Sequence, residues 1–196
     1  MPLPTPADAP PPPDALPIIL RPSTDADVPA MLGIYCYHVQ HGIGDFKPEP
    51  EPVQLREIKR RRKIMLKRKM PHIVAECGGA VVGYAIAAPF RKQPAYRYTV
   101  EHSIYVHRDH LRRGVGRLLL PALIRACAAA GFAQMIAVVD GTNLPSLSLH
   151  ESCGFQRSGV LRGVGFKFGR WTDSVLLQRP LTADDWPAES SPPQHS

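Results

Sequence analysis

The chain has 196 residues and a formal net charge of +7, a length typical of one domain that buries roughly 70% of its extended surface. No apolar run approaches the ~18 residues of a membrane span, and the N-terminus lacks a charged segment before an apolar core. We therefore expect neither a membrane span nor a secretory leader. The four cysteines are widely spaced without a Cys-x-x-Cys motif, so we expect reduced thiols in the cytoplasm and no metal site.

The two ends of the chain differ in composition from its middle. Residues 1–16 consist mostly of Pro, Ala and Asp, and residues 183–196 are rich in Pro, Ser and acidic side chains. Such segments cannot bury enough apolar surface to offset the entropy lost on ordering. We expect two disordered tails that flank a single domain of residues 17–182.

The first half of that domain alternates between short strands and helices. We expect a strand over 18–21, then a helix that Thr24 or Asp25 caps and that ends near Gly42. A loop over 43–52 leads to a second helix over about 53–69. Strands over 72–77 and 80–88 follow, and Gly78-Gly79 between them favours a hairpin.

The second half begins with a strand over 98–106. The pattern then predicts a long helix over 117–130 closed by Gly131, a strand over 134–139 and a short helix over 145–153. Two more strands, over about 157–168 and 172–178, complete the domain. The order of elements predicts a mixed α/β sheet with an antiparallel front half.

A basic turn rich in glycine lies between the strand over 98–106 and the long helix. Gly114 and Gly116 have no Cβ, so the backbone can coil tightly and bring its N–H groups close to an anion. The helix N-terminus adds partial positive charge. Full charges come from Arg112, Arg113 and Arg117. The turn therefore predicts a diphosphate site, with Glu101 on the strand before it.

These motifs together resemble the GNAT superfamily of N-acetyltransferases, in which Gln/Arg-x-x-Gly-x-Gly/Ala binds the pyrophosphate of coenzyme A. Leu111 stands at the first position of that motif, so Arg112 or Arg113 has to compensate for the usual side chain. The segment 143–155 resembles the family's Asn-x-x-Ala-x-x-Leu-Tyr-Glu-Lys-x-Gly-Phe, with His150 in place of Tyr.

Within that superfamily the chain looks like the phosphinothricin and methionine sulfoximine acetyltransferases. The runs at 45–50, 95–101 and 163–171 carry this likeness, and the whole resemblance extends over about 18–181. It implies a GNAT fold, with helices flanking a mixed and mostly antiparallel sheet. It also implies acetyl-CoA as cosubstrate without a metal, a small amino-acid-like amine as acceptor, and a homodimer.

The resemblance also implies roles for individual residues. Glu101 matches the family's catalytic carboxylate, and a general base of this kind contributes roughly 10²–10⁴-fold to the rate. His150 stands where the family's Tyr protonates the leaving thiolate, so we expect it to assist proton movement there or with Glu101. The expected coenzyme-binding residues are Ile104, Tyr105, Val106, Arg112, Arg113, Gly114, Val115, Gly116, Arg117 and Asn143. The expected acceptor-binding residues are Phe46, Arg91, Tyr96 and Arg97.

Two alternatives to this function remain. The helix over 53–69 carries nine Lys and Arg residues, which suits a non-catalytic module that binds nucleic acid or an anionic membrane. No aromatic residue interleaves these charges, so we favour a solvated helix with a narrow stripe of Leu55, Ile58, Met65 and Leu66, and no such partner. The second alternative is an N-acetyltransferase that acts on proteins, peptides or other amines.

Three histidines lie close together in the sequence before the glycine turn. His102, His107 and His110 do not have the spacing of a zinc site. We interpret them as turn and surface residues.

Overall fold

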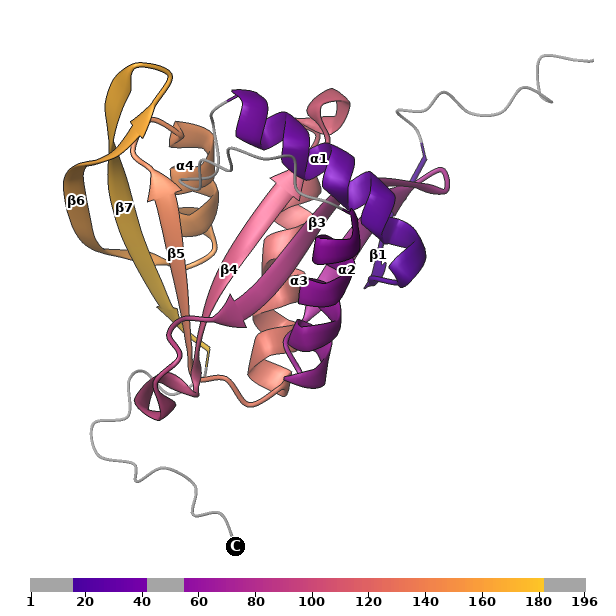
Figure 1. Cartoon of the computed structure of the whole chain (residues 1–196), viewed down its shortest axis with the longest axis horizontal. Helices are drawn as coiled ribbons and strands as arrows, with labels where there is room; N and C mark the ends of the chain where they lie inside the picture. The colour runs from indigo at the N-terminus through magenta and orange to yellow at the C-terminus, as the bar shows by residue number, and fades with distance from the viewer. Residues whose placement is uncertain (1–15, 42–54, 182–196) are drawn as a thin grey trace, which may run out of the picture.

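The computed structural model describes residues 16–41 and 55–181. Phe46 and the two predicted tails, apart from Leu16, lie outside the described residues. Within them, a seven-stranded sheet with the order β1-β2-β3-β4-β5-β7-β6 forms the centre of the molecule (Figure 1). Its strands are β1 (Ile18–Pro22), β2 (His72–Cys77), β3 (Ala80–Pro89), β4 (Thr99–Val106), β5 (Gln134–Asp140), β6 (Gln156–Lys167) and β7 (Arg170–Pro180).

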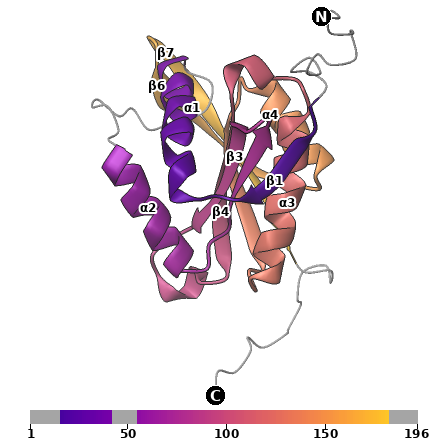
Figure 2. The same ribbon diagram turned by 90° about the vertical axis from the view of Figure 1, so that its right-hand side faces the viewer.

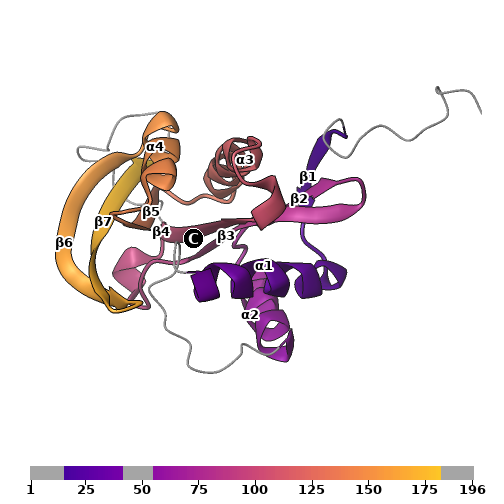
Figure 3. The ribbon, with the colours of Figure 1, turned by 90° about the horizontal axis from the view of Figure 1, so that it is seen from above.

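Helices cover both faces of this sheet. Figures 2 and 3 show α1 (Val28–His41) and α2 (Leu55–Lys67) on one face, and α3 (Val115–Ala129) and α4 (Leu144–Ser152) on the other. Neighbouring strands run antiparallel except β4 and β5, which are parallel because α3 connects them as a crossover. The expected mixed and mostly antiparallel sheet is confirmed.

Each face has its own apolar core. On the α3 side, Leu119, Leu120 and Leu123 are fully buried, and burial of each such side chain contributes roughly 1.5–3 kcal/mol. A smaller cluster under α1 contains Met31, Ile34, Val74, Tyr84 and Tyr105. Because successive strand residues face opposite ways, Tyr105 marks the α1 face of β4 and Val100 the α3 face.

The ends of the helices follow local signals in the sequence. Asp27 accepts hydrogen bonds from the N–H and hydroxyl of Thr24, at 2.6 and 3.0 Å, just before α1. Gly114 is the N-cap of α3 with φ of 82°, so this helix begins at Val115, earlier than the predicted Arg117. Gly131 closes it with φ of 86°, as expected.

One pair of strands separates partway along its length. β4 and β5 pair from Thr99↔Gln134 to Glu101↔Ile136, although both strands continue beyond that point (Figure 1). β5 remains paired with β7 as far as Asp140. The second half of β4 therefore presents an open edge toward β5.

Two predictions about burial are wrong. Leu55 and Leu66 of α2 are 37% and 42% exposed, whereas Arg62 is 7% exposed and donates to Ser23 and Asp25. This helix therefore turns an arginine inward, because polar groups near β1 bind its guanidinium. His102 is not a turn or surface residue but a buried residue of β4, since strand alternation points it toward α4. None of the described helices has the length and apolar character to cross a membrane.

Candidate active site

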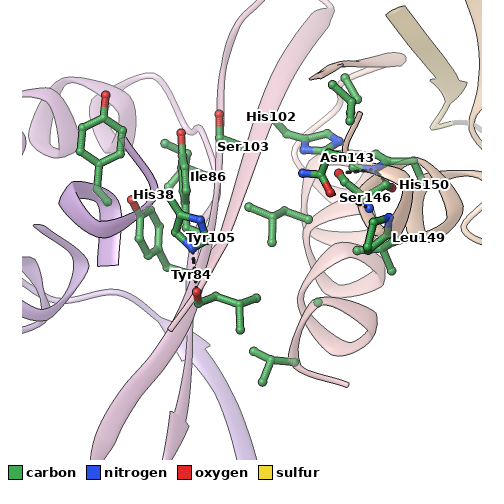
Figure 4. A pocket seen from close by; sticks show the side chains of 18 of the residues that line it. His38, Tyr84, Ile86, His102, Ser103, Tyr105, Asn143, Ser146, Leu149 and His150 are labelled. Carbon is green, nitrogen blue, oxygen red and sulfur yellow. Dashed lines mark hydrogen bonds between the residues drawn. The ribbon is translucent and has the colours of Figure 1, made fainter. Parts of the chain in front are cut away.

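A cavity of about 1080 Å³ lies where β4 and β5 separate. It is lined from both faces of the sheet, by residues of α1 and α2 on one side and of α3 and α4 on the other (Figure 4). Its volume slightly exceeds the ~300–1,000 Å³ common for small-molecule sites. It is therefore large enough to hold two ligands that meet at the sheet.

The glycine turn forms one end of the cavity. Arg112 and Gly114 have positive φ, 62° and 82°, and such a backbone turns successive N–H groups toward one point, as in anion-binding nests. The first helical bond of α3 runs from the Leu118 N–H to the Gly114 carbonyl, at 3.2 Å. The N–H groups of the first turn lie outside the helical ladder. With Arg117 beside them, they fit a diphosphate.

Helix α4 packs closely beside this turn. A Cβ on Gly116 would lie 3.0 Å from Cδ2 of Leu149, so glycine permits the close approach of α3 to α4. Asn143 caps α4 by accepting a hydrogen bond from the Ser146 N–H at 3.2 Å, and it lines the cavity. The turn and the start of α4 thus share one wall.

The open edge of β4 forms a second wall. The Phe90 N–H donates to the Thr99 carbonyl and the His107 N–H to the Val82 carbonyl, so odd-numbered residues of β4 bond to β3. By the alternation of an antiparallel ladder, the N–H groups of Ile104 and Val106 turn toward β5. The Val106 carbonyl accepts from Nε2–H of His38 at 2.7 Å. This edge fits an extended ligand arm with amide groups, whereas the Tyr105 side chain packs under α1.

Glu101 lies at the point where the strands separate. It is half-buried, lines the cavity and lies on the α1 face of β4 with Ser103. The aromatic rings of Tyr35, Tyr84 and Tyr105 cluster on that face, with centroid distances of 5.6 Å for Tyr35–Tyr105 and 5.1 Å for Tyr84–Tyr105. Arg61 of α2 also lines this part of the cavity. The α1 side therefore combines a carboxylate, aromatic walls and a cation.

His150 and His102 lie on the opposite side. His150 is 4% exposed, and its ring stacks on His102 at 5.0 Å with an interplanar angle of 7°. Burial lowers the pKa of His150, although the hydrogen bond to the Ser146 carbonyl opposes this shift. Burial also lowers the pKa of His102, to about 3, and the neighbouring His150 adds to the effect. Both rings are therefore neutral at neutral pH.

The structure brings most of the predicted site residues to one cavity: Glu101, His150, the open β4 edge, Asn143 and the glycine turn. Arg113 is the one predicted residue of that turn that does not line the cavity. Arg91, Tyr96 and Arg97 are also not among the lining residues. Arg91 lies 5.2 Å from the Phe90 ring and 5.4 Å from the Tyr96 ring, and Arg97 lies 4.6 Å from Tyr98. The role of Arg91, Tyr96 and Arg97 in acceptor binding stays a prediction. Phe46 lies outside the described residues, so its predicted role is not tested.

The sequence analysis missed His102 and Arg61 as cavity residues. Because strand residues alternate, the sequence could show that His102 and Glu101 face opposite sides of the sheet. It could not show that His150 packs against His102 on that side. Within residues 16–41 and 55–181, no group of His, Cys, Asp and Glu side chains is arranged to hold a metal ion.

Comparisons with known proteins agree with this geometry. The Acetyltransferase (GNAT) family profile matches residues 37–155. Phosphinothricin N-acetyltransferase of Alcaligenes faecalis is 46% identical over 162 residues, 82% of this chain and 81% of that protein. L-methionine sulfoximine/L-methionine sulfone acetyltransferase of Pseudomonas paraeruginosa is 35% identical over 174 residues, 88% of this chain and 98% of that protein.

Solved structures show the same fold. The phosphinothricin acetyltransferase of Sinorhizobium meliloti in complex with acetyl-CoA is 38% identical and has a TM-score of 0.80. The match covers 83% of this chain and 88% of the chain in that structure. YncA of Salmonella typhimurium, also with acetyl-CoA, is 33% identical and has a TM-score of 0.82. The match covers 88% of this chain and 99% of the chain in that structure. The expected fold and enzyme class, an acetyl-CoA-dependent N-acetyltransferase, are confirmed. The chain belongs to the GNAT family of acetyltransferases.

Proposed function

We propose that this protein acetylates the amino group of a small amino-acid-like acceptor of the phosphinothricin or methionine sulfoximine type. The observation that carries this proposal is the continuous cavity from the glycine turn, past the open edge of β4, to Glu101. A coenzyme bound at the turn and an amine bound on the α1 side meet where β4 and β5 separate. The names of the relatives at 46% and 35% identity support this class of acceptor.

In the proposed chemistry Glu101 is the general base. An α-amine has a pKa near ~8 even in peptides, so most of it is an ammonium ion at neutral pH and has to lose a proton before it attacks. Glu101 takes that proton, directly or through water. Acetyl-CoA supplies the activated acyl group: the C–N bond forms as the C–S bond breaks, the coenzyme leaves as a thiolate, and the second proton that the nitrogen loses goes to that thiolate or to water. An N–H group of the Ile104–Val106 segment stabilises the charge on the acyl oxygen, and one such donor contributes roughly 10²–10³-fold.

His150 is the second proposed catalytic residue. Its position on α4 places it across the sheet from Glu101, in the wall shared with Asn143. We assign it to the coenzyme side of the cavity. The amine side is then left to Glu101.

An anionic acceptor needs a cation on the α1 side. Arg61 lines the cavity there, and Glu57 accepts from its Nε at 2.8 Å, which orients the guanidinium. An arginine can bind a carboxylate or phosphinate through two parallel hydrogen bonds. We propose Arg61 for this role beside the loop residues Arg91 and Arg97 and the walls Phe46 and Tyr96.

We also propose that the protein is a cytoplasmic homodimer. The hairpin of β6 and β7 exposes six large apolar side chains, each 46% to 70% exposed: Val160, Leu161, Val164, Phe166, Phe168 and Trp171. Contiguous apolar patches of this kind commonly mark interfaces. A second copy of this chain would cover the patch. The four cysteines are free thiols, which fits a reducing compartment.

The basic helix offers little support for a nucleic-acid module. Arg60 and Arg61 both pair with Glu57, and the buried Arg62 pairs with Asp25. These pairs neutralise part of the positive face and join α2 to the segment after β1. The remaining exposed lysines and arginines form an ordinary solvated surface.

A thiol-release assay with acetyl-CoA tests the proposal. The panel contains phosphinothricin, methionine sulfoximine, methionine sulfone, the common amino acids and short peptides. We expect turnover with the small anionic analogues and none with peptides. Turnover of peptides alone would contradict it, and salt-sensitive DNA binding without acetyl-CoA binding would favour the non-catalytic module.

A further inference from the structure

A compact cluster of three aromatic rings lies beside the cavity, and the proposed reaction uses only one of them. His102 of β4 and His150 of α4 stack with ring centroids 5.0 Å apart. The Phe155 ring meets both nearly edge-on, at 5.4 and 5.2 Å. Figure 4 shows the two histidines next to Asn143 and Ser146. The cluster leaves His150 little room to rotate.

The hydrogen bonds of His150 determine which ring nitrogen carries its proton. Nδ1 lies 2.6 Å from the Ser146 carbonyl oxygen. Because a carbonyl only accepts, Nδ1 is the donor and carries the hydrogen. A neutral imidazole has one N–H, so Nε2 holds a lone pair and acts as an acceptor. Among the described residues, this buried Nε2 has no hydrogen-bond partner.

This assignment limits what His150 can do. In its neutral form with the proton on Nδ1, it has no proton on Nε2 to give to a leaving thiolate. It can accept one there, or accept a hydrogen bond from a thiol, amide or ammonium donor. The structure therefore favours an acceptor over the proton donor that the family's Tyr implies.

His102 is buried at a cost that simple packing does not explain. Neither of its ring nitrogens has a hydrogen-bond partner among the described residues, and it is 7% exposed. An unsatisfied buried donor or acceptor costs roughly 1–3 kcal/mol. What His102 offers to its neighbours is therefore its planar ring, which stacks on His150 and meets Phe155 edge-on.

We propose that His102 is a positioning residue for acetyl transfer: its ring, stacked on His150, holds that imidazole with Nδ1–H on the Ser146 carbonyl and keeps Nε2 as an acceptor for a ligand donor. This inference rests on the proposed function. Phe155 supports the pair from the side, and the stack shields one face of the His150 ring from water. The pair stays neutral because burial lowers the pKa of both rings, and for His102 the neighbouring His150 adds to the effect.

The charged groups around the pair that line the cavity are Glu101 on β4, Asp140 at the end of β5, and Arg112 and Arg117 at the glycine turn and the start of α3. Glu151 of α4 lies outside the cavity and pairs with Arg157 at 2.7 Å. Asp140 accepts from the N–H and hydroxyl of Thr142, at 2.8 and 2.6 Å. The shifted pKa of His150 is set by burial and the Ser146 carbonyl.

Nitrogen-15 spectra of histidine-labelled full-length protein test this directly, since imidazole shifts report tautomer and protonation. For the wild type we expect His150 to be neutral with the proton on Nδ1 at neutral pH. In His102→Leu we expect the other tautomer or protonation at higher pH, and a kcat roughly 10- to 100-fold lower because the ring is misplaced. His102→Phe keeps the stack, so both signals and most of kcat should remain.

Val100→Ala is the matched control for lost packing, because it lies two residues earlier on the same face of β4 and is fully buried. It should lower stability but leave the His150 signals unchanged. Unchanged His150 signals in His102→Leu would overturn the proposal. The proposal would also be overturned if His102→Phe lost as much kcat as His102→Leu while its His150 signals stayed like those of the wild type. The spectra need no turnover, so an inactive wild type would contradict the proposed function and not this inference.

Discussion

Glu101 and His102 are consecutive residues of β4 whose side chains line one cavity from opposite faces of the sheet. Glu101 lies on the face of α1 with Tyr105, and His102 stacks on His150 of α4. This is possible because β4 loses β5 as a neighbour after Glu101. The separation of the strands lets one cavity reach both faces, so an amine and a thioester can approach from different sides.

Removal of the Glu101 carboxylate should abolish most of the rate. We expect Glu101→Gln to lower kcat roughly 10²–10⁴-fold, because the amide cannot take the proton of the amine. Binding of acetyl-CoA, measured by calorimetry, should remain. Glu151→Gln is the control, since that exposed carboxylate pairs with Arg157 at 2.7 Å and lies outside the cavity. Equal activity of the two variants would exclude Glu101 as the base.

The glycine turn should determine affinity for the coenzyme. Gly114→Ala introduces a Cβ at φ of 82°, which costs roughly 1–2 kcal/mol in that conformation, and we expect weaker acetyl-CoA binding. Arg117→Gln should also raise the dissociation constant and reduce its dependence on salt. Arg125→Gln, an exposed arginine on the same helix that does not line the cavity, should change neither. Wild-type affinity in Gly114→Ala would contradict the diphosphate site.

The acceptor's anionic group should depend on an arginine of α2. We expect Arg61→Gln to raise KM for phosphinothricin roughly tenfold, the loss of a charge-assisted pair of about 1.4 kcal/mol. The KM of acetyl-CoA should not change. Arg91→Gln and Arg97→Gln are the paired comparison, because these arginines lie against loop aromatics outside the lining residues. If Arg61→Gln leaves the KM for phosphinothricin unchanged and either loop variant raises it, the acceptor site belongs to the loop.

Stability should fall as the pH drops from ~6.5 toward about 4. Burial lowers the pKa of His72 to about 4 and that of His102 to about 3, whereas both are near ~6.5 in the unfolded chain. In that window the unfolded state binds more protons, so the free energy of unfolding decreases with falling pH. Above this pH window both histidines are neutral in the folded and the unfolded state, so they do not make the free energy of unfolding depend on pH.

Urea unfolding at pH 5 and pH 7.5 measures this slope. We expect a shallower dependence for His102→Phe, which removes one titrating ring but keeps the aromatic volume. Val100→Ala, which removes no titrating group from the same strand, should retain the wild-type dependence. The same slope in all three proteins would show that the buried histidines do not determine acid stability.

The β6–β7 hairpin should mediate self-association. Trp171 is 70% exposed and its ring lies 5.0 Å from that of Phe166, so the two form one apolar surface. We expect a dimer by sedimentation for the wild type and a monomer for a Phe168→Asp/Trp171→Asp variant, since a charge in an apolar interface is costly. Arg157→Gln, on the same hairpin, is the control. A wild-type monomer at micromolar concentration would contradict the dimer.

Much of the site was predictable because it is written in short stretches of sequence. The glycine turn and the face of Glu101 depend on residues a few positions apart, so local backbone preferences determine them. The family motifs added the coenzyme and the reaction class. The start of α3 was placed two residues late, because Gly114 and not a later residue is its N-cap.

Tertiary structure alone decided the rest, because it depends on contacts between residues far apart in the chain. Only the folded chain shows that β4 and β5 part after Glu101, that His102 meets His150, and that Arg62 turns inward to Ser23 and Asp25. A strand pattern gives the face of a residue but not what packs against that face. For that physical reason the sequence by itself determined the reaction class and the glycine turn, whereas the histidine pair and the shape of the cavity came from the packing of the helices on the sheet.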